Sequence, residues 1–178
     1  MKWINKKHCM IDLETTAALA DACIMSIGAC KFDLGGLGIT DKFYLNVDAK
    51  SCKKLGMRVD LETLKWWAKQ PKPVRDALQL PTPIDIHEAL TEFAKWYDAD
   101  YIWCRGMFDV PILDLAFHLT GIKSPYKYWD AIDHRTICTL LGEDFTRISK
   151  SSDDYHNALG DAVRQATHVI KLFEKEPF

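Results

Sequence analysis

The chain has 178 residues, of which 48% are hydrophobic and 27% charged, and its formal net charge at pH 7 is −2. These values are ordinary for a globular protein, and a single domain spanning residues 1–178 accommodates them. No apolar run approaches the roughly 20 residues that a membrane-spanning helix needs, so the sequence predicts no such helix.

Cysteine usage and the first residues indicate the compartment. The six cysteines form no C-x-x-C pair, and several of them lie in apolar runs, as buried reduced thiols do. The segment Met1–His8 is basic but lacks the apolar core of a secretory signal. Together these features predict a cytoplasmic protein with free thiols.

Three strands are predicted first along the chain. The run that starts at His8 and closes in Ile11–Thr16 is predicted to be a strand, as are residues 23–32 and 43–47, with a glycine-rich turn over residues 35–38. This order predicts a β-meander.

Helices mixed with a further strand follow the meander. Apolar residues at helical spacing predict helices over residues 61–70, 85–97, 108–121 and 158–174. The first of them ends before Pro71, residues 101–104 form a predicted strand, and the polar loop over residues 142–155 is the best candidate for a mobile segment. The element order indicates a mixed α/β domain.

Two acids stand at the end of the first strand. Side chains at i and i+2 of a strand project to the same face, so Asp12 and Glu14 are expected to stand side by side. Such carboxylates raise each other's pKa unless a cation lies between them, and a divalent metal ion is the commonest such partner. The alternative is a strand end with two solvated acids.

Three further residues have both a structural and a functional interpretation. Asp109 lies where a predicted strand turns into a helix, and it is either an N-cap or a functional acid. Asp161 is either solvated or faces a cleft between the last helix and the sheet. His156 precedes it by five residues, about 140° around a helix, so it is expected on the preceding loop, folded over the site. The other histidines have no ligand spacing with one another and are predicted to be structural: His8, His87, His118, His134 and His168.

These motifs, in this order, resemble those of the DEDDh 3′–5′ exonuclease family: Asp12-Leu13-Glu14-Thr15, then Phe108-Asp109, then His156-x-x-x-x-Asp161. The resemblance implies a ribonuclease-H-like α/β fold, with a central mixed β-sheet flanked by helices. A closer likeness, to the exonuclease A family of T-even phages, is carried by Thr63–Gln70, Trp103–Asp109 and Arg135-Thr136. A phage-encoded protein would work in the cytoplasm of the host cell.

The resemblance implies a metal-dependent 3′–5′ exonuclease that hydrolyses terminal phosphodiesters and releases nucleoside 5′-monophosphates. Two divalent cations, Mg²⁺ or Mn²⁺, would be held by Asp12, Glu14, Asp109 and Asp161, with Asp12 bridging both ions, in a two-metal mechanism. His156 would be the general base that takes a proton from the attacking water. Two bound ions would add four charges to −2 and give +2, so the net charge does not exclude a nucleic-acid substrate.

Residues for substrate recognition are sought beside these motifs. Apolar residues next to the acids could wedge against terminal bases or belong to the core, and arginines could contact phosphate or be surface charges. Trp66 and Trp67 face about 100° apart on a helix, so one is expected in the core and the other at the substrate. The substrate-binding candidates are Leu13, Thr15, Phe108, Arg105 and Trp67.

The expected partner is a nucleic acid with a free 3′ end. The phage likeness favours single-stranded DNA over RNA. Two alternatives remain open. One is a 3′–5′ exoribonuclease of the same superfamily, since nothing in the sequence reports on a contact to the 2′-OH. The other is a non-catalytic nucleic-acid-binding module.

Overall fold

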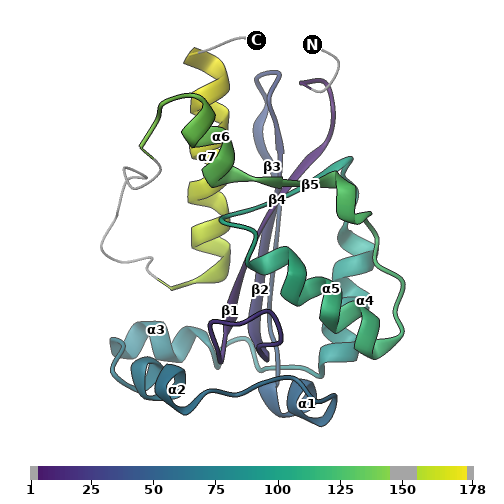
Figure 1. The fold of residues 1–178 in the computed structure, drawn as a ribbon, viewed down its shortest axis with the longest axis vertical. Helices are drawn as coiled ribbons and strands as arrows, with labels where there is room; N and C mark the ends of the chain where they lie inside the picture. Colours follow the sequence, from purple (N-terminus) through teal and green to yellow (C-terminus); the bar gives the residue numbers. More distant parts are fainter. Residues whose placement is uncertain (1–3, 145–155, 176–178) are drawn as a thin grey trace.

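A five-stranded sheet organises the molecule (Figure 1). The structure is a computed structural model that describes residues 4–144 and 156–175, so most of the loop predicted to be mobile, residues 145–155, lies outside the described residues. The strands in sequence order are β1 (His8–Thr15), β2 (Ile24–Asp33), β3 (Gly38–Asn46), β4 (Tyr101–Cys104) and β5 (Ala131–Asp133). Their order across the sheet is β3-β2-β1-β4-β5.

The sheet is mixed, with its change of direction at β1. β1 pairs antiparallel with β2, and β2 with β3, while β1 with β4 and β4 with β5 are parallel pairs. The predicted meander and central mixed sheet are thereby confirmed. Because β1, β4 and β5 run in the same direction, the segments that leave their carboxyl ends meet at one edge of the sheet, where open α/β folds place their sites.

Helices cover both faces of this sheet. Figure 1 shows α7, with α6 beside it, on one side of the strands and α4 and α5 on the other, while α2 and α3 lie beyond one end of the sheet. No helix in the described part of the chain offers an apolar stretch that could span a lipid bilayer. The helices are α1 (Ala49–Lys54), α2 (Leu61–Ala68), α3 (Lys72–Ala77), α4 (Ile86–Trp96), α5 (Asp109–Thr120), α6 (His134–Leu140) and α7 (Ala158–Lys175), with a 3₁₀ turn η1 (Tyr128–Asp130).

The four predicted helices are present, but α1, α3 and α6 were not predicted as helices. Pro71 and Pro73 were expected only to stop the preceding helix. In the structure Pro71 is also the N-cap residue of α3, and Pro73 lies in its first turn. The fixed φ of proline and its missing N–H suit a helix start as well as a helix stop, which explains the difference.

Alternation along β1 separates the core from the acids. Cys9, Ile11 and Leu13 belong to the larger apolar cluster, which packs against α4 and α5. Met10 belongs to the smaller cluster, together with apolar residues of α7. Since neighbours along a strand alternate in direction, Asp12 and Glu14 continue the row of Met10 and face α7.

Helix α7 approaches the sheet closely at one glycine. Gly28 of β2 lies opposite Asp12 in the antiparallel register. A Cβ atom at Gly28 would lie 2.1 Å from the carbonyl carbon of Ala158, the first residue of α7. Only glycine permits this approach, so Gly28 sets the distance between α7 and the acids of β1.

Candidate active site

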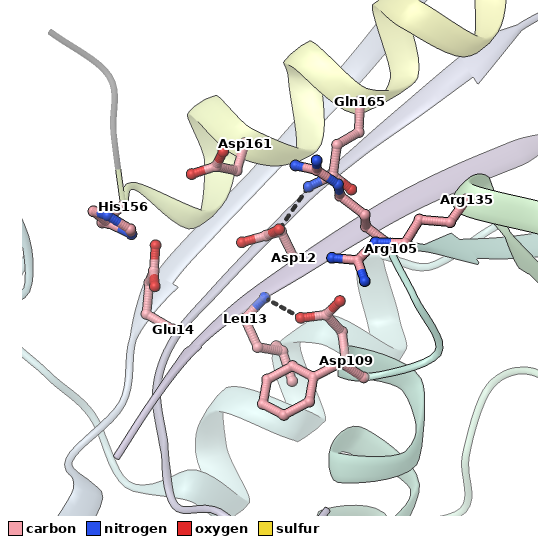
Figure 2. Close-up of a pocket in the computed structure, with 10 residues that line it drawn as sticks. Asp12, Leu13, Glu14, Arg105, Asp109, Arg135, His156, Asp161 and Gln165 are labelled. Carbon is pink, nitrogen blue, oxygen red and sulfur yellow. Dashed lines mark hydrogen bonds between the residues drawn. The ribbon is translucent and has the colours of Figure 1, made fainter. Parts of the chain in front are cut away.

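A cavity of about 440 Å³ opens where β1 ends (Figure 2). Its walls come from β1, from the connection between β4 and α5, from the start of α6, and from α7 with the residues just before it. The cavity therefore gathers all the residues predicted to be catalytic, although they are far apart in the sequence. Its lining consists of Asp12, Leu13, Glu14, Arg105, Phe108, Asp109, Arg135, His156, Asp161 and Gln165.

Three of the acids converge closely enough to share a cation. One carboxylate oxygen from each of Asp12, Glu14 and Asp161 lies within 4.8 Å of the other two. Oxygen ligands bind Mg²⁺ at about 2.0–2.1 Å and Ca²⁺ at about 2.3–2.6 Å, so two oxygens on one such ion lie at most about 4–5 Å apart. The three acids thus fit a hard divalent cation with little movement. Asp109 is not part of this trio, although it lines the same cavity.

The start of α7 brings Asp161 and His156 to the cavity. The side chain of Asn157 accepts a hydrogen bond of 2.9 Å from the backbone N–H of Gly160, as an N-cap residue does. His156 therefore lies outside the helix, with a φ of 58°. Its predicted position on the loop before the helix is confirmed. Asp161, in the first turn, pairs with Arg164 one turn later.

Asp109 faces the sheet instead of capping its own helix. The N-cap position of α5 is Phe108, which makes no side-chain capping bond, and Asp109 is the first residue of the helix. Its Oδ1 accepts a 2.9 Å hydrogen bond from the backbone N–H of Leu13 on β1. The N-cap interpretation is therefore wrong, because the tertiary contact with β1 directs this carboxylate toward the other acids.

Gln165 positions Asp12. Its side-chain N–H donates a 2.7 Å hydrogen bond to Oδ1 of Asp12, and only 2% of the residue is exposed. Gln165 lies one turn after Asp161 on α7, so the same helix face supplies one acid and fixes the orientation of another. The sequence argument missed it, because a glutamine in an amphipathic helix has no distinguishing pattern.

Burial and mutual repulsion raise the pKa of all four acids. Burial raises the pKa of Glu14 to about 8, with a further rise from Asp161 and Asp109. Burial raises the pKa of Asp109 to about 7, although hydrogen bonds from backbone N–H groups oppose the rise. The pKa of Asp12 lies well above its usual value because of burial and then the charges of the other three acids. Burial also raises the pKa of Asp161, against the opposing charge of Arg164.

Metal affinity should therefore depend steeply on pH. Below the raised pKa values of Glu14 and Asp109 the ligands are protonated, and a cation must displace those protons. We expect the dissociation constant for Mn²⁺ to fall by at least about tenfold between pH 6 and pH 8, with about one proton released per ion at pH 7. Calorimetric titrations in buffers of different ionisation enthalpy measure both quantities. A dissociation constant for Mn²⁺ that does not change with pH, with no proton released on binding, would contradict the raised pKa values of these acids.

His156 sits at the mouth of the acid cluster against aromatic rings. Its ring centroid lies 4.6 Å from that of Trp66 and 5.9 Å from that of Trp67, edge to face in both cases. Burial lowers the pKa of His156, against a smaller opposing effect of Asp161. The imidazole is therefore neutral at pH 7 and able to accept a proton.

The structure distinguishes the two tryptophans. Trp67 is 7% exposed and its indole N–H donates a 2.9 Å hydrogen bond to the carbonyl of Thr15, whereas Trp66 is 42% exposed. Trp66 therefore presents the open face of the pair, and the role of Trp67 in substrate binding stays a prediction. Both rings line a second groove of about 210 Å³ that shares Leu13, Glu14 and Phe108 with the main cavity.

The other substrate-binding candidates also lie beside the cavity. Leu13, Phe108 and Arg105 line it, and Thr15 lines the second groove, where its hydroxyl donates to the carbonyl of Ala17. The role of each in binding stays a prediction.

Gly28 was missed by the sequence argument, although a lone glycine inside a strand pattern is a known signal of close backbone approach.

Comparison with known families identifies a match over almost the whole chain. The model described as "3′-5′ exoribonuclease Rv2179c-like domain" matches residues 7–173. No curated protein sequence matches the chain. The predicted likeness to exonuclease A of T-even phages is not among these findings and stays a prediction.

Solved exonuclease structures share the fold at low sequence identity. Exonuclease I of Escherichia coli in complex with a dT13 oligonucleotide aligns with a TM-score of 0.68 and 10% identity, covering 97% of this chain and 42% of that one. The nuclease domain of 3′hExo, a DEDDh family member bound to rAMP, aligns with a TM-score of 0.60 and 14% identity, covering 96% and 92%.

A further neighbour, exonuclease I of Methylocaldum szegediense, gives a TM-score of 0.65 and 12% identity, and the alignment covers 96% of this chain. The chain spans only 41% of the length of that enzyme. These similarities confirm the ribonuclease-H-like fold, with its mixed sheet flanked by helices.

Proposed function

Because the chain belongs to the Rv2179c-like 3′–5′ exoribonuclease domain family and is a 3′–5′ exonuclease of the DEDDh type, we propose that it removes nucleotides one at a time from the 3′ end of single strands. The products would be nucleoside 5′-monophosphates. The observation that carries the proposal is the convergence of Asp12, Glu14 and Asp161 within 4.8 Å in a cavity that His156 also lines. Membership in an enzyme family speaks against the alternative of a non-catalytic binding module.

The acids would hold the cations. Asp12, Glu14 and Asp161 are the first ligand set, and Asp109 completes it from the opposite wall of the cavity (Figure 2). The resemblance to the DEDDh family makes Asp12 the expected ligand of both ions, and Asp12 lines the cavity together with the other three acids. When bound, two Mg²⁺ or Mn²⁺ ions supply the positive charge that activates the attacking water and stabilises the departing 3′-oxygen.

The protein's own groups orient the reactants and move the proton. The neutral imidazole of His156 would take the proton of the attacking water, because its lowered pKa keeps it unprotonated at pH 7. Gln165 holds Asp12 in position through its 2.7 Å hydrogen bond. Arg105 and Arg135 line the wall beside Asp109, where their charge suits the phosphates of the substrate.

The terminal bases would lie in the groove that joins the cavity at Leu13 and Phe108. Trp66 offers its exposed ring there, and stacking on an aromatic ring stabilises a base by about 1–3 kcal/mol. Trp66→Ala should therefore raise KM for a single-stranded substrate by about tenfold, with a smaller change in kcat. Steady-state kinetics measure the split. Trp129→Ala, at an exposed tryptophan of η1 outside both pockets, is the control. A fall in kcat with no change in KM would instead indicate that Trp66 positions the ring of His156.

The close approach of α7 to β2 at Gly28 leads to a second prediction. In Gly28→Ala the added Cβ would clash with Ala158 at 2.1 Å, so the start of α7 must move away from β2 by about 1 Å or more. Asp161 moves with it, and we expect kcat/KM to fall by about a hundredfold while the protein stays folded. Gly35→Ala, in an exposed turn where the new Cβ meets only a side-chain carboxylate at 3.2 Å, should keep full activity. Full activity of Gly28→Ala would contradict the proposed role of this contact.

The nature of the sugar is the finer part of the proposal. The phage likeness of the sequence favours single-stranded DNA. The matching family is described as an exoribonuclease domain, which makes RNA the second candidate. Related structures carry either one: a dT13 oligonucleotide in one exonuclease I structure, and histone mRNA stem-loop recognition in a 3′-exonuclease that matches with a TM-score of 0.66.

One cleavage experiment tests both the activity and the sugar. Single strands of DNA and RNA of one sequence, labelled at the 5′ end, would be incubated with Mg²⁺ or Mn²⁺, with EDTA in parallel. We expect a metal-dependent ladder that shortens from the 3′ end, together with mononucleotide 5′-phosphates. The faster substrate decides between DNA and RNA. If the folded protein cleaves neither strand with either metal, the alternative of a non-catalytic nucleic-acid-binding module would be favoured.

A further inference from the structure

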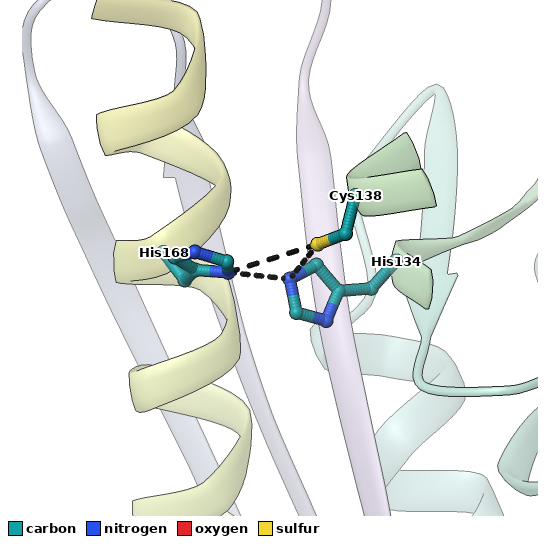
Figure 3. Close-up of side chains that lie close together, drawn as sticks. All are labelled: His134, Cys138 and His168. Atoms are coloured by element: carbon teal, nitrogen blue, oxygen red, sulfur yellow. Dashed lines mark hydrogen bonds between the residues drawn. The ribbon is translucent and has the colours of Figure 1, made fainter. Parts of the chain in front are cut away.

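Three potential ligand atoms converge between α6 and α7, outside the cavity of the acids (Figure 3). Nε2 of His134 lies 2.9 Å from Nδ1 of His168. Sγ of Cys138 lies 3.4 Å from the first nitrogen and 3.9 Å from the second. The sequence shows no ligand spacing for this pair, and the packing of α6 on α7 joins two histidines that are 34 positions apart.

The spacing of these atoms suits tetrahedral zinc. With Zn–N of about 2.0–2.1 Å and Zn–S of about 2.3 Å, tetrahedral angles place the nitrogens about 3.3 Å apart and each nitrogen about 3.6 Å from the sulfur. The two N···S distances, 3.4 and 3.9 Å, lie on either side of that value. The N···N distance of 2.9 Å must open by about 0.4 Å, which is a small side-chain movement.

The donors and their surroundings also suit such an ion. His134 and Cys138 lie one turn apart on α6 and are fully buried, while His168 on α7 is partly exposed and leaves a route for the ion. Thiolate and imidazole ligands select zinc over Mg²⁺ and Mn²⁺, which prefer oxygen.

We propose that His134, Cys138 and His168 bind a zinc ion that joins α6 to α7, with water or an added ligand in the fourth position. This site is independent of the nuclease chemistry and of the cations held by the acids. Its ligands are close in sequence to two residues that line the catalytic cavity, Gln165 and Arg135. His168 follows Gln165 by three residues on α7, and His134 precedes Arg135 on α6. The ion would therefore fix both elements that place these residues at the cavity.

Cobalt provides a direct test, because a thiolate bound to Co²⁺ gives a charge-transfer band that carboxylate ligands do not give. The full-length chain, reduced and freed of metal by a chelator, would be titrated with Co²⁺ and then with Zn²⁺. We expect one equivalent of Co²⁺ to produce the band and one equivalent of Zn²⁺ to remove it. Asp12→Asn should give the same result, since the acids take no part.

Matched variants locate the ligands. Cys138→Ser and His168→Gln, which keep the size of the side chains, should lose the band, whereas Cys52→Ser, at another fully buried cysteine, should keep it. Zn²⁺ at about a hundredfold excess over its dissociation constant should raise the Tm of the wild type and of Cys52→Ser by about 5 °C or more. Cys138→Ser should show no such rise. Absence of the band in folded wild-type protein, or its persistence in Cys138→Ser, would overturn the proposal.

Discussion

Asp12→Asn is expected to reduce cleavage by at least about a thousandfold. The resemblance of its motif to that of the DEDDh family makes Asp12 the expected ligand of both proposed cations, so its loss would remove a ligand from each. A cation supplies several kcal/mol of transition-state stabilisation, and each 1.36 kcal/mol corresponds to a tenfold change in rate. Single-turnover cleavage of a labelled single strand at saturating Mn²⁺ measures the loss.

The asparagine variant separates chemistry from folding. Asparagine keeps the shape of the side chain and the acceptor for the 2.7 Å hydrogen bond from Gln165. Burial and like charges raise the pKa of Asp12, so replacing the carboxylate should leave the Tm of the metal-free protein unchanged or higher. Asp98→Asn, at an exposed acid paired with Lys7, should retain normal turnover. Turnover by Asp12→Asn within tenfold of the wild type would show that Asp12 is not a required ligand.

His156→Ala is expected to reduce kcat by at least about a hundredfold, in line with the usual contribution of a general base. The effect should fall on kcat and much less on KM, because in the proposed mechanism the ring would contact the reacting water and not the body of the substrate. Steady-state kinetics on a single strand, with His87→Ala as an exposed control on α4, give the two constants. A near-normal kcat would refute the assignment of the base.

The pH profile gives the same assignment a second measurement. A base must be unprotonated, so kcat falls as the pH drops through the pKa of His156. Since burial lowers this pKa below the usual 6.5, the fall should lie on the acid side of pH 6.5 at saturating Mn²⁺. In His156→Ala the decrease of kcat at acid pH should disappear. If the decrease stays unchanged, it arises from protonation of the acids that are proposed to bind the cations.

The local pattern of the sequence was sufficient for the elements and for the acids of β1. Runs of strand-forming residues around a glycine-rich turn predicted the meander. The i, i+2 relation placed Asp12 and Glu14 on one face, as the structure has them. Helical spacing predicted four of the helices. The angle between His156 and Asp161 predicted that the histidine lies before α7, where Asn157 caps the helix. Each of these predictions depends on neighbours within about five residues along the chain.

Only the tertiary structure decided which way side chains turn when their partners are distant in sequence. Asp109 faces β1 because the backbone N–H of Leu13, 96 residues earlier, is its hydrogen-bond partner. Trp66 and Trp67 could not be assigned to groove and core by helical periodicity, because the rotation of α2 depends on a contact between Trp67 and Thr15 across 52 residues.

Contacts between residues that are distant in sequence also explain why the remaining features could not be predicted. Gln165 reaches Asp12 across 153 residues, and the histidines of the proposed zinc site come from two helices. A sequence shows which residue types are available and how each element is patterned. How α7 rests on the sheet depends on the long-range fit of side chains and on the space left by Gly28, and no local period encodes either.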